Sequence, residues 1–138
     1  MAVHVLIVDA DMSAAAVTHA IVKRVAPEAT VVCESTSDRG WLSIQQMTPD
    51  VLIIDPVVQG PGGTLLIQLC KEEHPAMRIV VLASLPTPAL RATVKRLNID
   101  VYLEKPAAMA ALADKLRTLI LSREAAGLVI PLPNIHHP

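Results

Sequence analysis

Short apolar runs alternate with stretches of helical periodicity along most of the chain. Between the runs, apolar positions recur three or four residues apart, as Val17, Ile21 and Val25 do, which is the pattern of an amphipathic helix. The runs themselves are rich in Val, Ile and Leu, as strands are. Five rounds of a strand followed by a helix are therefore predicted. The expected strands cover residues 3–8, 30–33, 51–54, 78–83 and 100–104.

The expected helices are bounded by residues that cap or interrupt helices. Pro27 and Pro75 follow the first and third helical patterns, because proline lacks the N–H that a helix interior needs. Ser37 is the predicted N-cap of the second helix, since a serine hydroxyl satisfies backbone N–H groups of a first turn. The apolar positions of the five helices span residues 14–25, 37–47, 65–74, 90–97 and 109–120.

Strands that alternate with helices imply a parallel sheet with right-handed crossovers. The strand at Val51–Ile54 is apolar on both faces, which is typical of a strand that helices cover on both sides. The expected fold class is therefore α/β, a doubly wound parallel sheet.

Length and composition narrow the classes of protein. The 138 residues suit one domain, and a formal net charge of −1 argues against direct nucleic-acid binding. Trp41 and Tyr102 are the only aromatic residues, so a base-stacking surface is not expected. No apolar run approaches the roughly 18 residues of a membrane span, so we expect a cytoplasmic protein without a signal peptide or membrane contact. Cys33 and Cys70 are expected to be reduced, buried thiols.

The end of the chain differs from the rest. Residues 123–138 hold three of the prolines and show no helical period. We therefore expect a domain over residues 1–122 and a C-terminal tail or linker over residues 123–138.

Polar residues that can bind ligands or react follow the predicted strands. In a parallel sheet, ligands bind beyond these carboxyl ends. Singly, Asp9 or Asp11 could cap a helix and Lys105 could be solvated. As a set they describe a phosphoryl site on a carboxylate, in which Mg²⁺ and a lysine neutralise the charge. The ends of the first, third, fourth and fifth strands carry Asp9 with Asp11, Asp55, Ser84 and Lys105.

In this order and spacing, these residues resemble the receiver domain of two-component response regulators, over about residues 3–122. Further points of resemblance are Pro106 after Lys105, Gly63 eight residues after Asp55, and Tyr102 three residues before Lys105. The resemblance implies a flavodoxin-like (βα)5 sheet with strand order 2-1-3-4-5. The first and third strands, and with them the two acids that end these strands, would then be neighbours.

The resemblance also implies roles for the residues. Asp55 would accept a phosphoryl group from a sensor histidine kinase or phosphotransfer protein. Mg²⁺ would be held by Asp9, Asp55 and the backbone carbonyl of Val57. Lys105 would pair with the phosphoryl group, Ser84 would move to hydrogen-bond it, and Tyr102 would rotate inward. The surface of the fourth helix, fifth strand and fifth helix would then change and select a partner or a homodimer, and the peptide bond before Pro106 would often be cis.

Four features depart from the family pattern. Ala10 replaces a second acid at the end of the first strand, and Pro56 removes an N–H beside Asp55. Val58 and Gln59 stand where the family has a Met-Pro pair, and Leu85 stands where a small residue is usual. Asp11 can move in as a metal ligand, metal affinity can fall, or the site can be silent. The alternative is a degenerate receiver that acts as an interaction or dimerisation module.

Two enzyme or carrier classes remain as rivals. Asp9 and Asp11 match the Asp-x-Asp motif of haloacid-dehalogenase-like phosphatases, with Asp9 as nucleophile, but no acidic pair follows Lys105 to complete the Mg²⁺ site. A flavin or nucleotide carrier would need a phosphate loop after the first strand, where Asp9 and Asp11 repel phosphate. The glycine-rich residues 59–63 follow the third strand instead, and we interpret them as a plain loop.

A basic stretch on the fourth helix is either a solvated face or a source of interface salt bridges (Arg91, Lys95 and Arg96).

Overall fold

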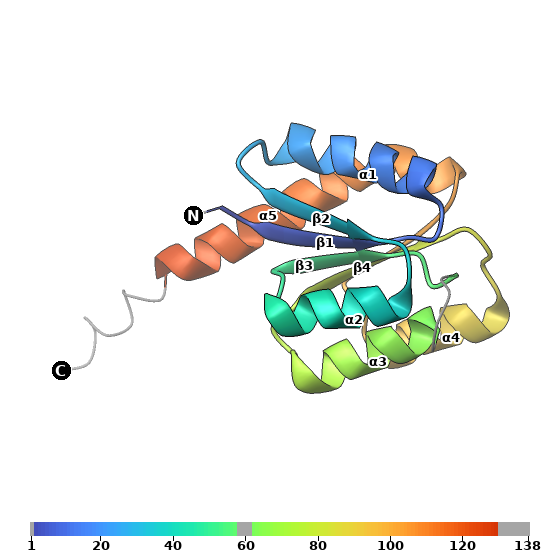
Figure 1. Cartoon of the computed structure of the whole chain (residues 1–138). Helices are drawn as coiled ribbons and strands as arrows, with labels where there is room; N and C mark the ends of the chain where they lie inside the picture. Colours follow the sequence, from blue (N-terminus) through green and yellow to red (C-terminus); the bar gives the residue numbers. More distant parts are fainter. Residues whose placement is uncertain (1, 58–61, 130–138) are drawn as a thin grey trace.

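The computed structural model describes residues 2–57 and 62–129, with side chains up to residue 121 (Figure 1). Its strands are β1 (His4–Val8), β2 (Thr30–Glu34), β3 (Val51–Ile54), β4 (Arg78–Ala83) and β5 (Val101–Glu104). Its helices are α1 (Met12–Val25), α2 (Ser37–Gln46), α3 (Gly63–Glu73), α4 (Pro88–Arg96) and α5 (Leu112–Val129), with a 3₁₀ turn η1 at Ala107–Ala111. Each predicted strand is confirmed to within one residue at either end.

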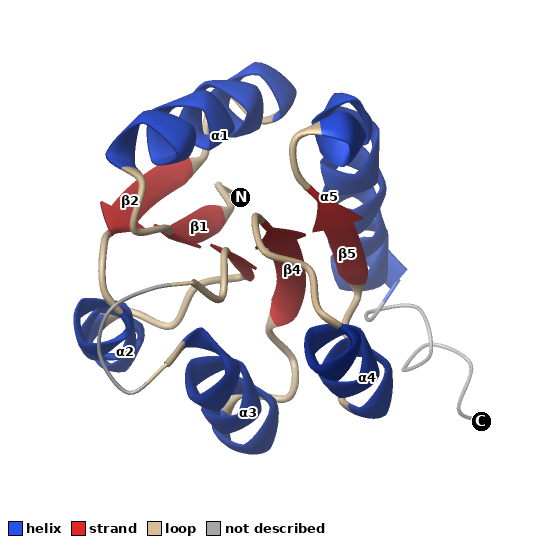
Figure 2. Cartoon of the chain, turned by 90° about the vertical axis from the view of Figure 1, so that its right-hand side faces the viewer, coloured by secondary structure: helices blue, strands red, loops and turns tan. Residues whose placement is uncertain are grey.

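The five strands form one parallel sheet in the order β2-β1-β3-β4-β5, as predicted. Helices α1 and α5 cover one face of the sheet, and α2, α3 and α4 cover the other (Figure 2). Alternation along β1 explains the two layers: Val5 and Ile7 pack toward α1 and α5, whereas Leu6 and Val8 pack toward α2 and α3. The strands are therefore apolar on both faces, as the sequence indicated.

The N-cap of α2 corrects a prediction. Thr36, not Ser37, is the cap: its Oγ1 accepts a hydrogen bond from the Arg39 N–H at 3.1 Å. Thr36 has the extended backbone of a cap residue, whereas Ser37 is the first helical residue and is buried. Two adjacent hydroxyl residues left the sequence pattern ambiguous by one position.

The C-terminal helix is longer than predicted. After η1, α5 runs to Val129 and so continues seven residues past residue 122. Residues 123–126 are Arg, Glu and two Ala, which are good helix formers, and the first proline after them is Pro131. The sequence shows no amphipathic period there, but the absence of such a period does not prevent a helix. The domain boundary itself stays a prediction, and residues 130–138 lie outside the described residues.

Within the described residues, no helix is both long enough and apolar enough to cross a bilayer.

Candidate functional site

The strand register brings the sequence-predicted residues to one edge of the sheet. Val8 pairs with Ile54 across β1 and β3, so Asp9 and Asp55 leave the sheet side by side. Ala83 pairs with Glu104 across β4 and β5, so Ser84 and Lys105 are the next residues on those strands. The carboxyl ends of four strands thus bring these residues to one edge of the sheet, as a doubly wound sheet allows.

Lys105 joins the two carboxylates. Its Nζ donates hydrogen bonds to Asp9 Oδ2 at 2.7 Å and to Asp55 Oδ2 at 3.1 Å. Both aspartates are only 4% exposed, and the lysine side chain is 13% exposed. One ammonium therefore faces two buried carboxylates, and this cluster has a formal charge of −1 at neutral pH. Buried charges persist only when they are paired in this way.

Burial and pairing act in opposite directions on the ammonium. Burial disfavours the charged form of Lys105, but the hydrogen bonds to Asp9 and Asp55 outweigh burial and raise the pKa of Lys105. The lysine is therefore a fixed cation over the physiological range. A fixed positive charge between two acids is the arrangement that a phosphoryl group on one of them would require.

The remaining carboxylate oxygens are held by the backbone. Asp9 Oδ1 accepts from the Asp11 N–H at 2.9 Å, and Asp55 Oδ1 accepts from the Val57 N–H at 3.1 Å. Both aspartates form Asx turns of this kind, which orient the carboxylates before any ligand arrives. The N–H that Pro56 lacks is thus supplied, one residue later, by Val57.

The structure does not bring Asp11 into the cluster. Asp11 is exposed and caps α1, where its Oδ1 accepts hydrogen bonds from the N–H groups of Ser13 at 2.9 Å and Ala14 at 3.1 Å. Of the two readings of Asp11 in the sequence, the helix cap is the one that the structure contains. This geometry gives no support to the general-acid role that a haloacid-dehalogenase-like phosphatase would need from Asp11.

The donor set fits a magnesium ion held by two protein carboxylates. Mg²⁺ prefers oxygen ligands and is held by one or two carboxylates together with water and phosphate oxygens. Asp9, Asp55 and the carbonyl of Val57 offer such oxygens, and the cluster's negative charge favours a cation. Within residues 2–57 and 62–129, no group of three or more His, Cys, Asp or Glu side chains converges on a metal position. The protein therefore supplies fewer side-chain ligands than a site with three or more such residues would.

Gly63 lies where α3 approaches Pro56, beside the carboxyl end of β3. A Cβ at this position would lie 2.5 Å from the carbonyl oxygen and 2.7 Å from the carbonyl carbon of Pro56, the residue after Asp55. Only glycine allows this approach between backbones. Residues 58–61, which include most of the expected glycine-rich loop, lie outside the described residues.

Ser84 follows the last residue of β4, and Tyr102 is the second residue of β5. Ser84 is exposed. Tyr102 is half-buried against the α2–α4 layer, and its hydroxyl donates to Glu104 Oε2 at 2.6 Å. The peptide bond between Lys105 and Pro106 is cis, as the resemblance implied.

The sequence analysis did not predict that Glu104 links β5 to α4. Glu104 accepts two hydrogen bonds from Arg91 of α4, at 2.7 Å from Nε and 3.2 Å from Nη2, besides the bond from Tyr102. These hydrogen bonds from Arg91 and then Tyr102 lower the pKa of Glu104. Burial, followed by the contact with Glu104, raises the pKa of Tyr102. The available signal was the period of two in β5, which puts Tyr102 and Glu104 on one face. Arg91 of the basic stretch thus pairs with Glu104 of the same chain and is half-exposed. An interface salt bridge from this stretch stays a prediction.

The two cysteines are free thiols. Cys70 is buried, and burial raises the pKa of its thiol to about 12. Cys33 is half-buried rather than buried, and its pKa is also raised, mainly by burial. Neither has the lowered pKa of a reactive thiol.

Comparisons with known proteins agree with this geometry. A family model described as the response regulator receiver domain matches residues 5–117. The chain is similar to the crystal structure of a receiver domain protein (CheY-like) from Methanospirillum hungatei JF-1, with a TM-score of 0.81 and 19% identity over 91% of this chain and 99% of that chain. No protein of curated function matched the sequence.

Two further solved structures share the fold. The BeF3-activated receiver domain of DrrB has a TM-score of 0.75 and 17% identity, over 87% of this chain and 98% of that one. RcsB from Salmonella enterica serovar Typhimurium, bound to the promoter rprA in the presence of phosphomimetic BeF3−, has a TM-score of 0.74 and 24% identity, over 84% of this chain and 66% of that one. At these identities the likeness shows the fold alone.

Proposed function

Because the chain belongs to the response regulator receiver domain family, a family of signalling modules, we propose that it is a phosphoacceptor of two-component signalling with Asp55 as the acceptor. The observation that carries the proposal is the double hydrogen bond from Lys105 to Asp9 and Asp55, at the carboxyl edge of the sheet. A buried carboxylate held between a fixed ammonium and a second acid suits a group that gains and loses a phosphoryl charge.

The transfer step balances in atoms and charge. An oxygen of the Asp55 carboxylate forms a bond to phosphorus while the bond between phosphorus and the nitrogen of a phosphohistidine breaks, and the imidazole leaves. A phosphoryl group brings about −1.5 to −2 charges to the site. Lys105 offsets part of this charge, and the Val57 N–H, which donates to Asp55 Oδ1, continues to orient the carboxyl group. Mg²⁺, when bound, supplies the remaining charge neutralisation.

We infer that Asp9, Asp55 and the Val57 carbonyl would hold Mg²⁺. The sequence also offered Asp11 as a ligand, but its two hydrogen bonds to the first turn of α1 favour the cap over the metal. With Ala10 at the position of the usual second acid, the site relies on two carboxylates, and we expect a weak magnesium affinity before phosphorylation.

The switching residues follow from the same geometry. Ser84 and Lys105 follow paired positions of β4 and β5 and are proposed to bind the phosphoryl oxygens. Inward rotation of Tyr102 would break its bond to Glu104 and leave Glu104 paired with Arg91 alone on the surface of α4, β5 and α5. Moving such a two-state equilibrium from mostly off to mostly on requires roughly 5.5 kcal/mol of differential binding.

The partners proposed are a sensor histidine kinase or phosphotransfer protein, and a second copy that pairs through α4, β5 and α5 in the phosphorylated state. A cytoplasmic location is part of the same proposal and rests on membership of the family. The chain itself is proposed to make no direct contact with nucleic acid, in keeping with its net charge of −1.

Binding of beryllofluoride tests the proposal. We expect Mg²⁺-dependent binding that changes the fluorescence of Trp41, the chain's one tryptophan, and incorporation of phosphate from acetyl phosphate. Asp55→Asn abolishes both, whereas the matched control Asp38→Asn, an exposed acid in the first turn of α2, abolishes neither. Undiminished labelling of Asp55→Asn would refute the assignment.

The same experiment separates the second candidate, a receiver that has lost phosphorylation and acts as an interaction module. Ala10 and the engagement of Asp11 in a helix cap favour this candidate. It predicts no beryllofluoride response of the wild type at any Mg²⁺ concentration.

A further inference from the structure

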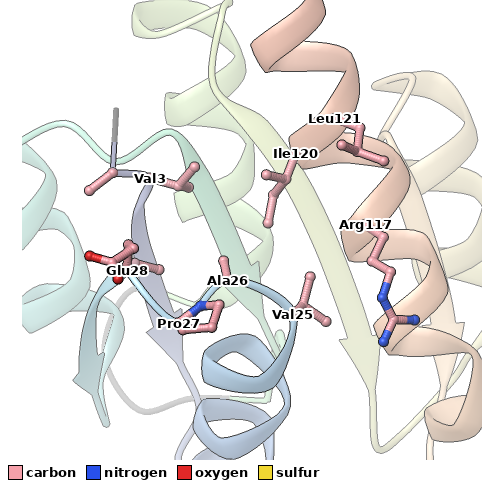
Figure 3. A pocket seen from close by; sticks show the side chains of 10 residues that line it. Val3, Val25, Ala26, Pro27, Glu28, Arg117, Ile120 and Leu121 are labelled. Carbon is pink, nitrogen blue, oxygen red and sulfur yellow. The ribbon is translucent and has the colours of Figure 1, made fainter.

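A pocket of about 640 Å³ lies at the edge of the sheet opposite to the phosphoryl site (Figure 3). Val3 lines it just before β1 begins, Ala26 and Pro27 line it from the connection between α1 and β2, and Ile120 lines it from α5. In a parallel sheet the amino ends of the strands share one edge, so this pocket and the phosphoryl site are separated by the length of the strands.

The pocket is apolar and lies next to an exposed apolar side chain. Val3 and Ile120 are each 6% exposed, whereas Leu121, which also lines the pocket, is 61% exposed. The same surface therefore offers an apolar hollow and an apolar side chain that can fill such a hollow. Apolar surface of this kind marks an interaction site more often than it marks a plain monomer surface.

Two opposite charges stand on opposite sides of the pocket. Glu28 lies on the side of β2 and Arg117 lies on the side of α5 (Figure 3). Arg117 is committed only to a surface pair within its own helix, from Nη1 to Asp114 Oδ1 at 2.8 Å, with the two side chains 50% and 85% exposed. Such an exposed pair contributes little and does not prevent Arg117 from pairing elsewhere.

This arrangement is complementary to itself, and we propose that a second copy of this chain docks on it as a two-fold symmetric dimer. In a two-fold contact the same patch faces itself, so an axis that passes between Glu28 and Arg117 brings Glu28 of one protomer opposite Arg117 of the other, twice. Leu121 of each protomer then covers the pocket of its partner. The backbone of α5 continues beyond the sheet to Val129 (Figure 1).

The dimer would not depend on phosphorylation. The patch shares no residue with the cluster of Asp9, Asp55 and Lys105 and lies at the other end of the strands. It also leaves α4 and the exposed side of β5 uncovered. Two copies would therefore be held together constitutively, each with its phosphoryl edge open to a kinase.

Sedimentation equilibrium of the full chain over a range of concentrations tests the dimer. Arg117→Glu and Glu28→Arg place like charges opposite each other, and we expect each to weaken dimerisation at least about tenfold. The double variant restores opposite charges in the swapped order, so its dissociation constant returns to near the wild-type value. The matched control is Lys115→Glu, the same charge reversal on α5 at a position that lines the β5 side instead.

A monomer at all concentrations, a dimer that Arg117→Glu does not weaken, or one that Lys115→Glu weakens equally would overturn the proposal. A double variant that does not regain the wild-type dissociation constant would also overturn it. Only a second copy pairs residue 28 with residue 117 of its partner, so another protein or the chain's own residues 130–138 in the pocket would give no such rescue. Asp55→Asn dimerises like the wild type, so the dimer and the phosphoacceptor role succeed or fail separately.

Discussion

Among single residues, Lys105 carries the charge balance of the phosphoryl edge. Its ammonium is the cation that hydrogen-bonds both Asp9 and Asp55, two acids that are 4% exposed. Neighbouring carboxylates without a cation repel each other and are costly to bury. The lysine is thus as much a structural counter-ion in the resting state as a partner for a phosphoryl group.

Replacing Lys105 with methionine removes the cation and keeps most of the side chain's volume. We expect Lys105→Met to lower the free energy of unfolding by about 2 kcal/mol at neutral pH, because the two acids lose their partner. Added Mg²⁺ should restore more stability to the variant than to the wild type, since a divalent cation takes over the charge balance. Urea unfolding with and without Mg²⁺ measures both effects.

The control for this prediction is Lys115→Met, which removes an exposed lysine of α5 that takes no part in the hydrogen bonds to Asp9 and Asp55. It should leave stability within a few tenths of a kcal/mol of the wild type. A Lys105→Met variant as stable as this control, with the same response to Mg²⁺, would contradict the counter-ion role.

Among the elements, the start of α3 is fixed by a close approach to Pro56. A Cβ at Gly63 would lie 2.5 Å from the Pro56 carbonyl oxygen, and the obstacle is backbone that cannot turn aside. We expect Gly63→Ala to lower the free energy of unfolding by about 1–3 kcal/mol and to weaken beryllofluoride binding, because Pro56 directly follows Asp55. The urea midpoint and the Trp41 fluorescence titration give the two readouts.

Thr64→Ala is the control for this helix start, since it changes the neighbouring residue and adds no atom. It should keep both the midpoint and the beryllofluoride affinity near the wild-type values. If Gly63→Ala instead behaves like Thr64→Ala, the backbone approach does not constrain the site.

A second link between elements joins α4 to β5 through Arg91, Glu104 and Tyr102. Tyr102 is the chain's one tyrosine, so phenolate absorbance in an alkaline titration reports this residue alone. Burial and then Glu104 raise the pKa of Tyr102, and Glu104→Gln should therefore lower it toward the ordinary value without reaching it. Because a raised pKa stabilises the fold below the unfolded pKa of about 10, this contribution is lost as the pH rises through the folded pKa.

Glu72→Gln serves as the control for this titration, since it neutralises an exposed acid of α3 outside the contact. The titration of Tyr102 should not respond to it. An unchanged pKa in Glu104→Gln would mean that the hydrogen bond between Tyr102 and Glu104 does not persist in solution.

For the whole molecule, the two ends of the sheet are proposed to have separate tasks. The carboxyl edge carries Asp9, Asp55 and Lys105, and the amino edge carries the apolar pocket between Glu28 and Arg117. The surface of α4, β5 and α5 runs between these ends and is proposed to respond to the phosphoryl group. A constitutive contact at one end and a switched contact along the side are compatible, because they use different residues of α5.

The sequence by itself determined the layout of the fold and the elements that carry the site. Short apolar runs and helical periodicity are local patterns, so they predicted five strands to within one residue and the order of strands and helices. Strand order followed from the resemblance, which rested on Asp9, Asp55, Ser84 and Lys105 in sequence. Local patterns failed where two adjacent residues could serve equally, as Thr36 and Ser37 do for one cap, and where a helix continues without an amphipathic period, as α5 does.

Only the tertiary structure decided which side chains meet. The register of β1 with β3 sets Asp9 beside Asp55, and the reach of Lys105 across to both acids depends on sequence separations of 96 and 50 residues. Asp11 had two equally good uses in sequence, and three-dimensional placement selected the cap. The pocket at the amino edge could not be foreseen either, since its lining joins the two ends of the domain. Contacts between distant residues depend on packing of the whole chain, which no local periodicity encodes.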